Sequence, residues 1–213
     1  MRLLAWGGVI APLLLTTVAV LGAALRPDYD HLHHFISELG ATGTPRAWIM
    51  NYLGFVPVGV CIVLFAASLG ARLPRHPSSA LGTLLLVLFG AGTVASGFAS
   101  CDVGCPQAGG SLENRVHDSV APLAFLAGSI GTIVLGARFR GVPGLCTLRA
   151  YSIASGLLAL ALFGALASTL ETRQLTGLWQ RLLVAVLFGW CAVVALRLLR
   201  EDPAAPVRAP TRR

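Results

Sequence analysis

A dense cluster of reactive side chains lies at positions 26–45 of the sequence, which read RPDYDHLHHFISELGATGTP. Histidine, carboxylate and serine side chains act as acid–base catalysts, nucleophiles and metal ligands. Acidic residues near the start, a glycine near the end and apolar residues three or four positions apart predict a short amphipathic helix at the membrane interface. On such a helix Asp30, His34 and Glu38 share one face, with Ser37 beside them.

Two cysteines form the next group, in the segment SCDVGCP at positions 100–106. Cys101 and Cys105 bracket turn-forming residues, and a disulfide between them is chemically permitted outside the cell membrane. A metal-binding pair and free thiols are the alternatives. Asp102, beside Cys101, adds a carboxylate to this segment.

Ionisable residues also stand at the ends of two apolar segments. His117 and Asp118 lie where the fourth segment begins, and Arg181 lies near the start of the last one. A charge at the mouth of a membrane helix is costly unless it is paired or hydrated, so these residues are functional candidates. Arg181 could pair with Glu171 or Asp118, or extend to the lipid headgroups.

These groups define candidate roles for named residues. Catalytic candidates are Ser37, Glu38, His117 and Asp118; ligand-binding candidates are Asp30, His33, His34, Asp102, Glu171 and Arg181; candidate metal ligands are His34, Glu38 and His117. Zinc bound by imidazole and carboxylate would activate water, but the chain has no His-Glu-x-x-His motif. If one site exists, we expect Glu38, Asp102, His117 and Arg181 to share a pocket.

The composition predicts the elements that position these residues. The chain has 213 residues, of which 55% are hydrophobic and 12% charged, and its mean hydropathy of +0.76 is typical of an integral membrane protein. Six apolar segments are each long enough to span a bilayer, near 4–24, 47–70, 79–98, 118–137, 150–170 and 178–199. We therefore expect one all-α domain over residues 1–200, a bundle of six transmembrane helices with an external helical cap. Residues 201–213 are expected to form a disordered cytoplasmic tail.

Small residues four positions apart indicate where the helices approach closely. Such pairs are Gly92 with Ser96, Gly128 with Thr132, and Gly164 with Ser168. Each pair is expected to lie at a contact between two helices.

The arginines predict the orientation of the chain in the membrane. With a cytoplasmic N-terminus, eleven arginines fall inside and five outside, which favours a multi-pass protein of the plasma membrane with both termini cytoplasmic. Seven of the nine acidic residues then fall outside, so we expect the functional surface there. The arginines form no stripe with interleaved aromatic residues, which excludes nucleic acid as a partner and leaves membrane lipids. Protein partners are not indicated by the sequence.

Several of these segments resemble a known family. YDHLHHFISELGATGTP, then NYLGFVPVGV, CDVGCP and a helix that opens with VHD resemble the DUF998 family of six-span prokaryotic membrane proteins. The resemblance covers residues 5–200 and implies a six-span architecture. It implies no reaction, because the function of the family is unknown. The extra histidines at positions 31, 33 and 34 do not belong to the matched pattern.

Four functions remain open at the level of the sequence. The first is an outward-facing Asp/Glu/His/Ser site that handles a lipid or small amphiphile. A metal-dependent hydrolase or transferase acting on a lipid is the second, with a non-metal enzyme using Ser37 and His117 as a variant. A transporter is the third, and an accessory structural protein is the fourth. A pocket that opens sideways to lipid would favour the first two, and one that runs to the cytoplasmic side would favour transport.

Overall fold

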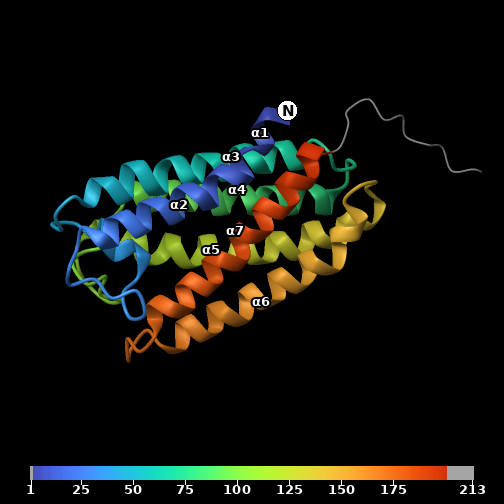
Figure 1. Cartoon of the computed structure of the whole chain (residues 1–213). Coiled ribbons are helices and arrows are strands. Elements are labelled where there is room, and N and C mark those ends of the chain that lie inside the picture. The colour runs from blue at the N-terminus through green and yellow to red at the C-terminus, as the bar shows by residue number, and fades with distance from the viewer. Residues whose placement is uncertain (1, 201–213) are drawn as a thin grey trace, which may run out of the picture.

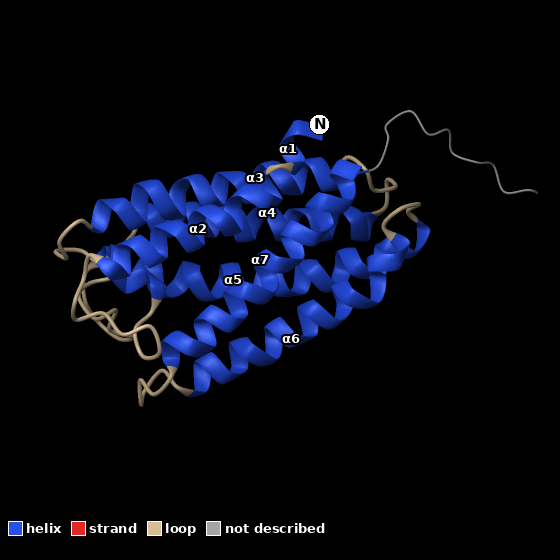
Figure 2. Cartoon of the chain, in the orientation of Figure 1, coloured by secondary structure: helices blue, strands red, loops and turns tan. Residues whose placement is uncertain are grey.

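Six helical segments cross the length of the molecule in the computed structural model, which describes residues 2–200. They are α1 (Arg2–Ala5) with α2 (Gly7–Ala24), η2 (Ile49–Phe55) with α3 (Val56–Gly70), α4 (Pro77–Phe98), α5 (Leu112–Arg138) with η3 (Phe139–Gly141), η4 (Cys146–Leu148) with α6 (Arg149–Ser168), and α7 (Thr176–Arg200). No strand occurs among these residues, and every segment is long and apolar enough to cross a membrane (Figures 1 and 2). The predicted six-span, all-helical fold is confirmed. The predicted disordered tail at 201–213 lies outside the described residues.

Consecutive helices pack side by side, and the last helix returns to the first. α4 packs between α3 and α5, α6 lies between α5 and α7, and α2 contacts both α3 and α7 (Figure 1). Trp190 of α7 is fully buried in this bundle, with its ring edge-on to Phe65 and its indole N–H donating to Ser152 Oγ at 2.8 Å. An indole buried in this way needs an acceptor, and Ser152 of α6 supplies it.

Glycines set the closest helix contacts. A Cβ at Gly59 of α3 would lie 2.4 Å from Gly90 O of α4, so only glycine permits this approach. The predicted contact positions Gly92 and Gly128 do lie at interfaces, because a Cβ at Gly92 would be 2.6 Å from Ala124 Cβ and one at Gly128 would be 2.9 Å from the Phe89 ring. The prediction for Gly164 is wrong, since a Cβ there would meet nothing within 4 Å.

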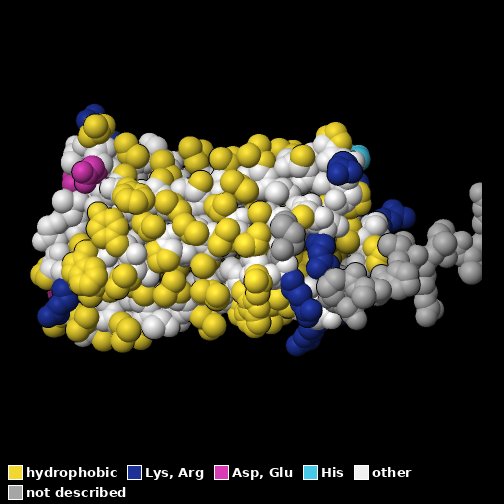
Figure 3. Space-filling view, turned by 90° about the horizontal axis from the view of Figure 1, so that it is seen from above, with side chains coloured by type: hydrophobic (Ala, Val, Ile, Leu, Met, Phe, Trp, Pro, Cys, Tyr) yellow, Lys and Arg dark blue, Asp and Glu magenta, His cyan; other side chains and the backbone are white. Residues whose placement is uncertain are grey.

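The two ends of the bundle differ in chemistry. Segments 25–48, 99–111 and 169–175 meet at one end, which we call the capped end. All seven acidic residues that the structure describes lie there, whereas eight of the thirteen described arginines lie toward the other end, and an apolar belt separates the two (Figure 3). This arrangement is that of a membrane-spanning bundle with two chemically distinct faces.

The cap is not the helix that the sequence predicts. Residues 26–34 form turns, and only Ile36–Gly40 form a short 3₁₀ helix, η1, all of it buried. Asp30, His34 and Glu38 therefore do not share one helical face, and that prediction is wrong. Tertiary packing prevails over the apolar spacing here: a Cβ at Gly40 would lie 2.0 Å from Asn51 Oδ1, because Asn51 of η2 packs on Gly40 and donates to its carbonyl at 2.9 Å.

Candidate functional site

Arg173, in the connection between α6 and α7, contacts two other segments of the cap. Its guanidinium donates to the carbonyl oxygens of Gly104 and Cys105, in the latter case at 3.1 Å. The same group lies over the Phe35 ring, with Cζ 4.7 Å from the centroid, and 3.9 Å from Glu38 Oε1. One side chain thus joins the α4–α5 connection to η1, which no local sequence pattern indicates.

The polar groups of Glu38 form contacts within the cap. Its Oε1 accepts from the backbone N–H of Phe35 at 3.0 Å, and its carbonyl accepts from Arg26 Nη1 at 2.6 Å. The carboxylate is buried and faces Arg173. Burial of a carboxylate is tolerated when it is hydrogen-bonded and paired with a cation, so these contacts account for Glu38 structurally.

The N-terminal part of α7 docks the segment that precedes η1. A Cβ at Gly177 would lie 2.4 Å from His34 O, so a glycine is needed where this backbone crosses the helix. Gln180 is buried, and its Oε1 accepts from the backbone N–H of Ile36 at 2.7 Å. These contacts fix the position of Ser37, the next residue along the chain.

Asn114, on the first turn of α5, organises the other half of the cap. It is fully buried, its Oδ1 accepts from Asp102 N at 3.0 Å, and its Nδ2 donates to Pro106 O at 3.0 Å. Nδ2 also donates to Asp118 Oδ2 at 2.9 Å, which positions that carboxylate. Asp102 in turn accepts from Ser111 N at 2.7 Å and Ser111 Oγ at 2.8 Å, and these two hydrogen bonds lower the pKa of Asp102.

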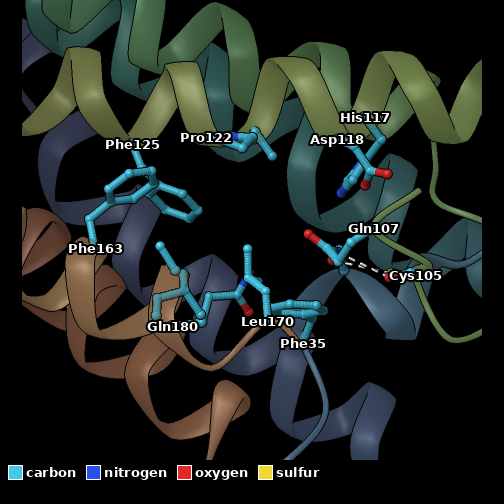
Figure 4. A pocket seen from close by; sticks show the side chains of 14 residues that line it. Phe35, Cys105, Gln107, His117, Asp118, Pro122, Phe125, Phe163, Leu170 and Gln180 are labelled. Atoms are coloured by element: carbon cyan, nitrogen blue, oxygen red, sulfur yellow. Dashed lines mark hydrogen bonds between the residues drawn. The ribbon is translucent and has the colours of Figure 1, made fainter. Parts of the chain in front are cut away.

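Under the cap lies a cavity of about 130 Å³ between α5, α6 and the start of α7. Its polar lining comes from Ser37, Gln107, His117, Asp118 and Gln180 (Figure 4). Its apolar lining includes Pro122 and Phe125 of α5 and Phe163, Leu166 and Leu170 on the α6 side. A smaller cavity of about 60 Å³ adjoins it and shares the lining residues Ser37, His117, Ala121, Phe125 and Gln180. The two together form what we call the inner cavity.

Aromatic rings close the inner cavity toward the middle of the bundle. Phe89 lies with its ring centroid 6.4 Å from that of Phe125 and 5.7 Å from that of Phe188. All three residues line the smaller part of the cavity, and Phe89 is fully buried. The cavity therefore ends at these rings and belongs to the capped half of the bundle.

Hydrogen bonds fix the chemical character of two lining residues. His117 Nδ1 lies 2.9 Å from Ala99 O, which can only accept, so Nδ1 carries a proton and Nε2 of the neutral ring is a hydrogen-bond acceptor. Gln180 uses Oε1 for Ile36, and among residues 2–200 its Nε2 donates no hydrogen bond. The cavity thus offers an imidazole acceptor and an amide donor.

The disulfide forms part of the wall. Cys101 and Cys105 are joined in the structure, and both are buried. Ser37 Oγ lies 3.6 Å from Cys105 Sγ. Because a disulfide sulfur has no proton, Ser37 must be the donor, which leaves the lone pairs of its oxygen for a ligand. Cys101 Sγ lies 3.8 Å from the backbone oxygen of Ser37.

The structure brings together only part of the predicted site. Ser37, His117 and Asp118 line the inner cavity, whereas Glu38 and Asp102 do not, and Arg181 lines a separate groove. The expected single pocket containing Glu38, Asp102, His117 and Arg181 is therefore wrong. His117 also lies inside a helix and not at its mouth, because α5 begins at Leu112.

The remaining candidates lie in turns at the surface of the cap. Asp30 pairs with His33 at 2.7 Å, and that hydrogen bond is the main reason why the pKa of Asp30 is lowered. His34 Nδ1 accepts from the backbone N–H of Asp30 at 3.0 Å. Glu171 is exposed in the turn after α6. These contacts are local, and they leave the four residues outside the inner cavity.

The candidate metal ligands do not meet. Among residues 2–200, no three His, Cys, Asp or Glu side chains are grouped so that they could hold a metal ion. Of the three proposed ligands, His34 and Glu38 are engaged by the cap as described, and only His117 lines the cavity. The residues that the structure describes therefore do not form a zinc site.

Three polar residues of the site are absent from the sequence-based candidates. Gln107 and Gln180 line the cavity, and Asn114 positions Asp118. Gln180 and Asn114 each lie one residue from a charged residue, at the end of an apolar segment. The rule that singled out His117 and Arg181 could have found them if uncharged amides had been included.

Comparison with known proteins gives one match. The family described as "Protein of unknown function (DUF998)" matches residues 9–197. The chain belongs to the DUF998 family. No curated protein and no solved structure matches it.

The segments that carry the DUF998 resemblance meet in space. η1 holds the ISELG stretch, the disulfide includes the cysteine of the Cys-Asp step, and His117 is the middle residue of the VHD sequence. Ser37 contacts both cysteines, and Ser37 and His117 line the same cavity. Three segments far apart in the sequence of this DUF998 protein thus converge on one cavity.

Proposed function

We propose that this DUF998 protein binds a single-chain amphiphile drawn from the membrane leaflet at its capped end. The inner cavity carries this proposal, because its polar groups lie beneath the cap and its aromatic and aliphatic walls lie deeper among the helices. Pockets that place a few polar groups in an apolar lining are the usual form of small-molecule sites.

The size of the cavity limits what enters it. Its larger part measures about 130 Å³, and a cavity of about 150 Å³ holds a molecule the size of benzene. A segment of hydrocarbon chain therefore fits, whereas a two-chain phospholipid does not. The exposed lining residues Gln107 and Ala167 mark a mouth beside α6, through which the remainder of the ligand would extend toward lipid.

The charge of the lining favours a neutral or positively charged head group. Asp118 is the one charged side chain among the residues lining the larger cavity. His117 Nε2 and Ser37 Oγ offer acceptors, and Gln180 Nε2 offers a donor. A hydroxyl or an amine can satisfy these groups, whereas an anion would be repelled by the carboxylate. A long-chain alcohol, amine or monoacylglycerol has this chemistry.

We also propose that the capped end faces outward across the cell membrane. The arginines concentrated at the opposite end support a cytoplasmic location for that end, by the positive-inside rule. The disulfide at the capped end supports the same orientation, because disulfides persist in oxidising compartments. The ligand would then come from the outer leaflet.

The other functions have less support. Metal-dependent chemistry would need a ligand set that the described residues do not form. Transport would favour a cavity that continues to the arginine-rich end, whereas this cavity ends at Phe89, Phe125 and Phe188. Binding is therefore the function that the geometry supports best.

Photolabelling with a long-chain alcohol that carries a diazirine tests the proposal. The purified protein in lipid nanodiscs is labelled over a range of probe concentrations, and labelled peptides are mapped by mass spectrometry. We expect saturable labelling of α5 and α6 next to Phe125 and Phe163. An unlabelled alcohol or amine of the same chain length should compete, and the corresponding alkyl sulfate should not.

Matched variants on α5 control the experiment. Ala121→Phe places a ring in both parts of the cavity, whereas Ala137→Phe adds the same ring to an exposed position. Ala121→Phe should weaken saturable labelling about tenfold or more, equivalent to about 1.4 kcal/mol, and Ala137→Phe should leave it unchanged. Labelling that does not saturate, or that is equal in the two variants, contradicts the proposal.

A further inference from the structure

We propose that a second site, a groove between α2 and α7, binds an anionic phospholipid with its phosphate on Arg181 and one acyl chain along the groove. This groove measures about 450 Å³. Its rim at the capped end is formed by His31 and Arg181, and the rest of its lining is apolar apart from Thr16. The two helices that form it lie in contact in the bundle (Figure 1). The inference is independent of the proposed ligand of the inner cavity.

Among the residues that the structure describes, no carboxylate neutralises the charge of Arg181. Its Nη1 donates to His34 O and to Gly177 O, both at 2.9 Å, and its Nη2 donates to Tyr29 Oη at 2.5 Å. The Tyr29 ring also lies 5.6 Å from Cζ. All these acceptors are neutral, and in the part of the chain that the structure describes no carboxylate forms an ion pair with Arg181.

These contacts immobilise the guanidinium instead of letting it extend freely into solvent. Arg181 is half-buried, and Tyr29 Oη is itself fixed by donating to Phe35 O at 2.8 Å. Neither Glu171 nor Asp118 forms an ion pair with Arg181, although the sequence analysis identified both as possible partners. A fixed cation at the edge of a bilayer without a counter-ion favours an anion, and a guanidinium matches a phosphate through two parallel hydrogen bonds.

The shape of the groove selects a lipid as the source of that anion. From Arg181 to Gly189 the groove follows α7 for about 12 Å at the helical rise of 1.5 Å per residue. Val20 and Ala185 on its walls are exposed and face the apolar belt. The cation thus lies at the headgroup end of an apolar channel, which complements a phospholipid and not a free anion.

The groove is separate from the inner cavity. Leu15 and Phe188 line both spaces and form the wall between them. The rims also differ in charge, because Arg181 stands at the groove and Asp118 at the cavity. The two sites should therefore prefer ligands of opposite charge.

Glycine positions provide a clean test of the groove. Gly189 lines it, and a Cβ there would meet nothing within 4 Å, so Gly189→Leu adds a side chain at the groove without a clash at Cβ. Gly164 of α6 has equally open surroundings and does not line the groove, so Gly164→Leu is the matched control. Arg181→Gln removes the charge and keeps hydrogen-bond donors.

Native mass spectrometry of the delipidated protein measures the binding. Phosphatidylglycerol and phosphatidylcholine with identical chains are titrated, and inorganic phosphate is added in a parallel series. We expect wild type to bind phosphatidylglycerol about tenfold more tightly than phosphatidylcholine, as one charge-assisted contact predicts. Gly189→Leu should weaken phosphatidylglycerol binding about tenfold, Gly164→Leu should not, and Arg181→Gln should abolish the preference.

Four results would overturn the inference. Equal affinity of wild type for the two lipids would show that the charge of Arg181 does not select the ligand. Unchanged affinity for phosphatidylglycerol in Gly189→Leu would show that the lipid binds outside the groove. Displacement of phosphatidylglycerol by inorganic phosphate would identify a free-anion site. A protein dimer that only Gly189→Leu dissociates would show that a second copy covers the groove. None of these results depends on whether the inner cavity binds an alcohol.

Discussion

Removing the Asn114 side chain should destabilise the capped end more than any ordinary surface change. Asn114→Ala deletes the contacts with Asp102 N, Pro106 O and Asp118 Oδ2, which lie at 3.0, 3.0 and 2.9 Å. Two neutral hydrogen bonds contribute about 1 kcal/mol each and one to a carboxylate about 2 kcal/mol, so we expect a loss of about 4 kcal/mol.

Thermal unfolding in detergent, followed by intrinsic fluorescence, measures this loss. For a chain of this length about 4 kcal/mol corresponds to a fall in Tm of about 10 °C. Ser119→Ala is the control, since Ser119 is exposed on the same helix and its hydroxyl donates only to Arg115 O. That change should alter stability by less than about 0.5 kcal/mol.

Asn114→Asp separates hydrogen bonding from packing. The variant keeps the shape of the side chain but loses the amide donors, and it places a carboxylate against Asp118. It should be less stable than wild type at neutral pH and recover at acid pH, because a protonated carboxyl can donate a hydrogen bond again. A fall in Tm of less than about 2 °C for Asn114→Ala, equal to that of Ser119→Ala, would refute the reasoning.

Three other variants test further parts of the structure. Replacing both Cys101 and Cys105 by serine should lower the free energy of unfolding by about 2 kcal/mol, because the bridge closes only a short loop. If reduction of wild type lowers Tm by less than this loss of free energy predicts, the disulfide is not structural. Asp102→Asn should lower Tm at neutral pH, where the carboxylate accepts both of its hydrogen bonds. Since the pKa of Asp102 is lowered by folding, the difference from wild type should vanish as the pH falls from 3.8 through the lower folded-state pKa, and a constant difference would refute this assignment. Gly59→Leu should destabilise the contact between α3 and α4 by about 3 kcal/mol, while Gly164→Leu should be neutral; equal Tm values for the two variants would show that the α3–α4 contact tolerates a side chain.

Much of the architecture follows from local sequence. Six apolar segments of spanning length determine six helices, because the backbone must satisfy its hydrogen bonds within each segment when water is absent. The spacing of small residues likewise indicates close helix contacts at Gly92 and Gly128, where steric size alone decides the approach. The motif segments determine family membership, since the match extends over residues 9–197.

The composition of the site depends on the tertiary structure instead. The apolar spacing around Asp30, His34 and Glu38 predicts a helix. From distant segments, however, Asn51 binds the Gly40 carbonyl and Arg173 faces the Glu38 carboxylate, and the region forms turns followed by η1. As a result Ser37 lines the cavity, whereas the carboxylate of its neighbour Glu38 accepts a hydrogen bond from Phe35 N and faces Arg173 within the cap. Sequence patterns report period and polarity within one segment, and they do not report which of two adjacent side chains a remote arginine will engage.

The sequence by itself thus determined that this protein spans a membrane six times, belongs to DUF998 and carries its acidic chemistry at one end. Those properties are sums over many residues, each contributing a small free energy of transfer or charge interaction. Only the tertiary structure decided that His117, Ser37 and Gln180 share a cavity while Arg181 stands at a separate groove. Such pairings depend on single long-range contacts. These are the hydrogen bond between His117 and Ala99 O, the crossing of the His34 backbone over Gly177, and the hydrogen bond from Arg181 to His34 O. The chain brings these partners together only when it folds.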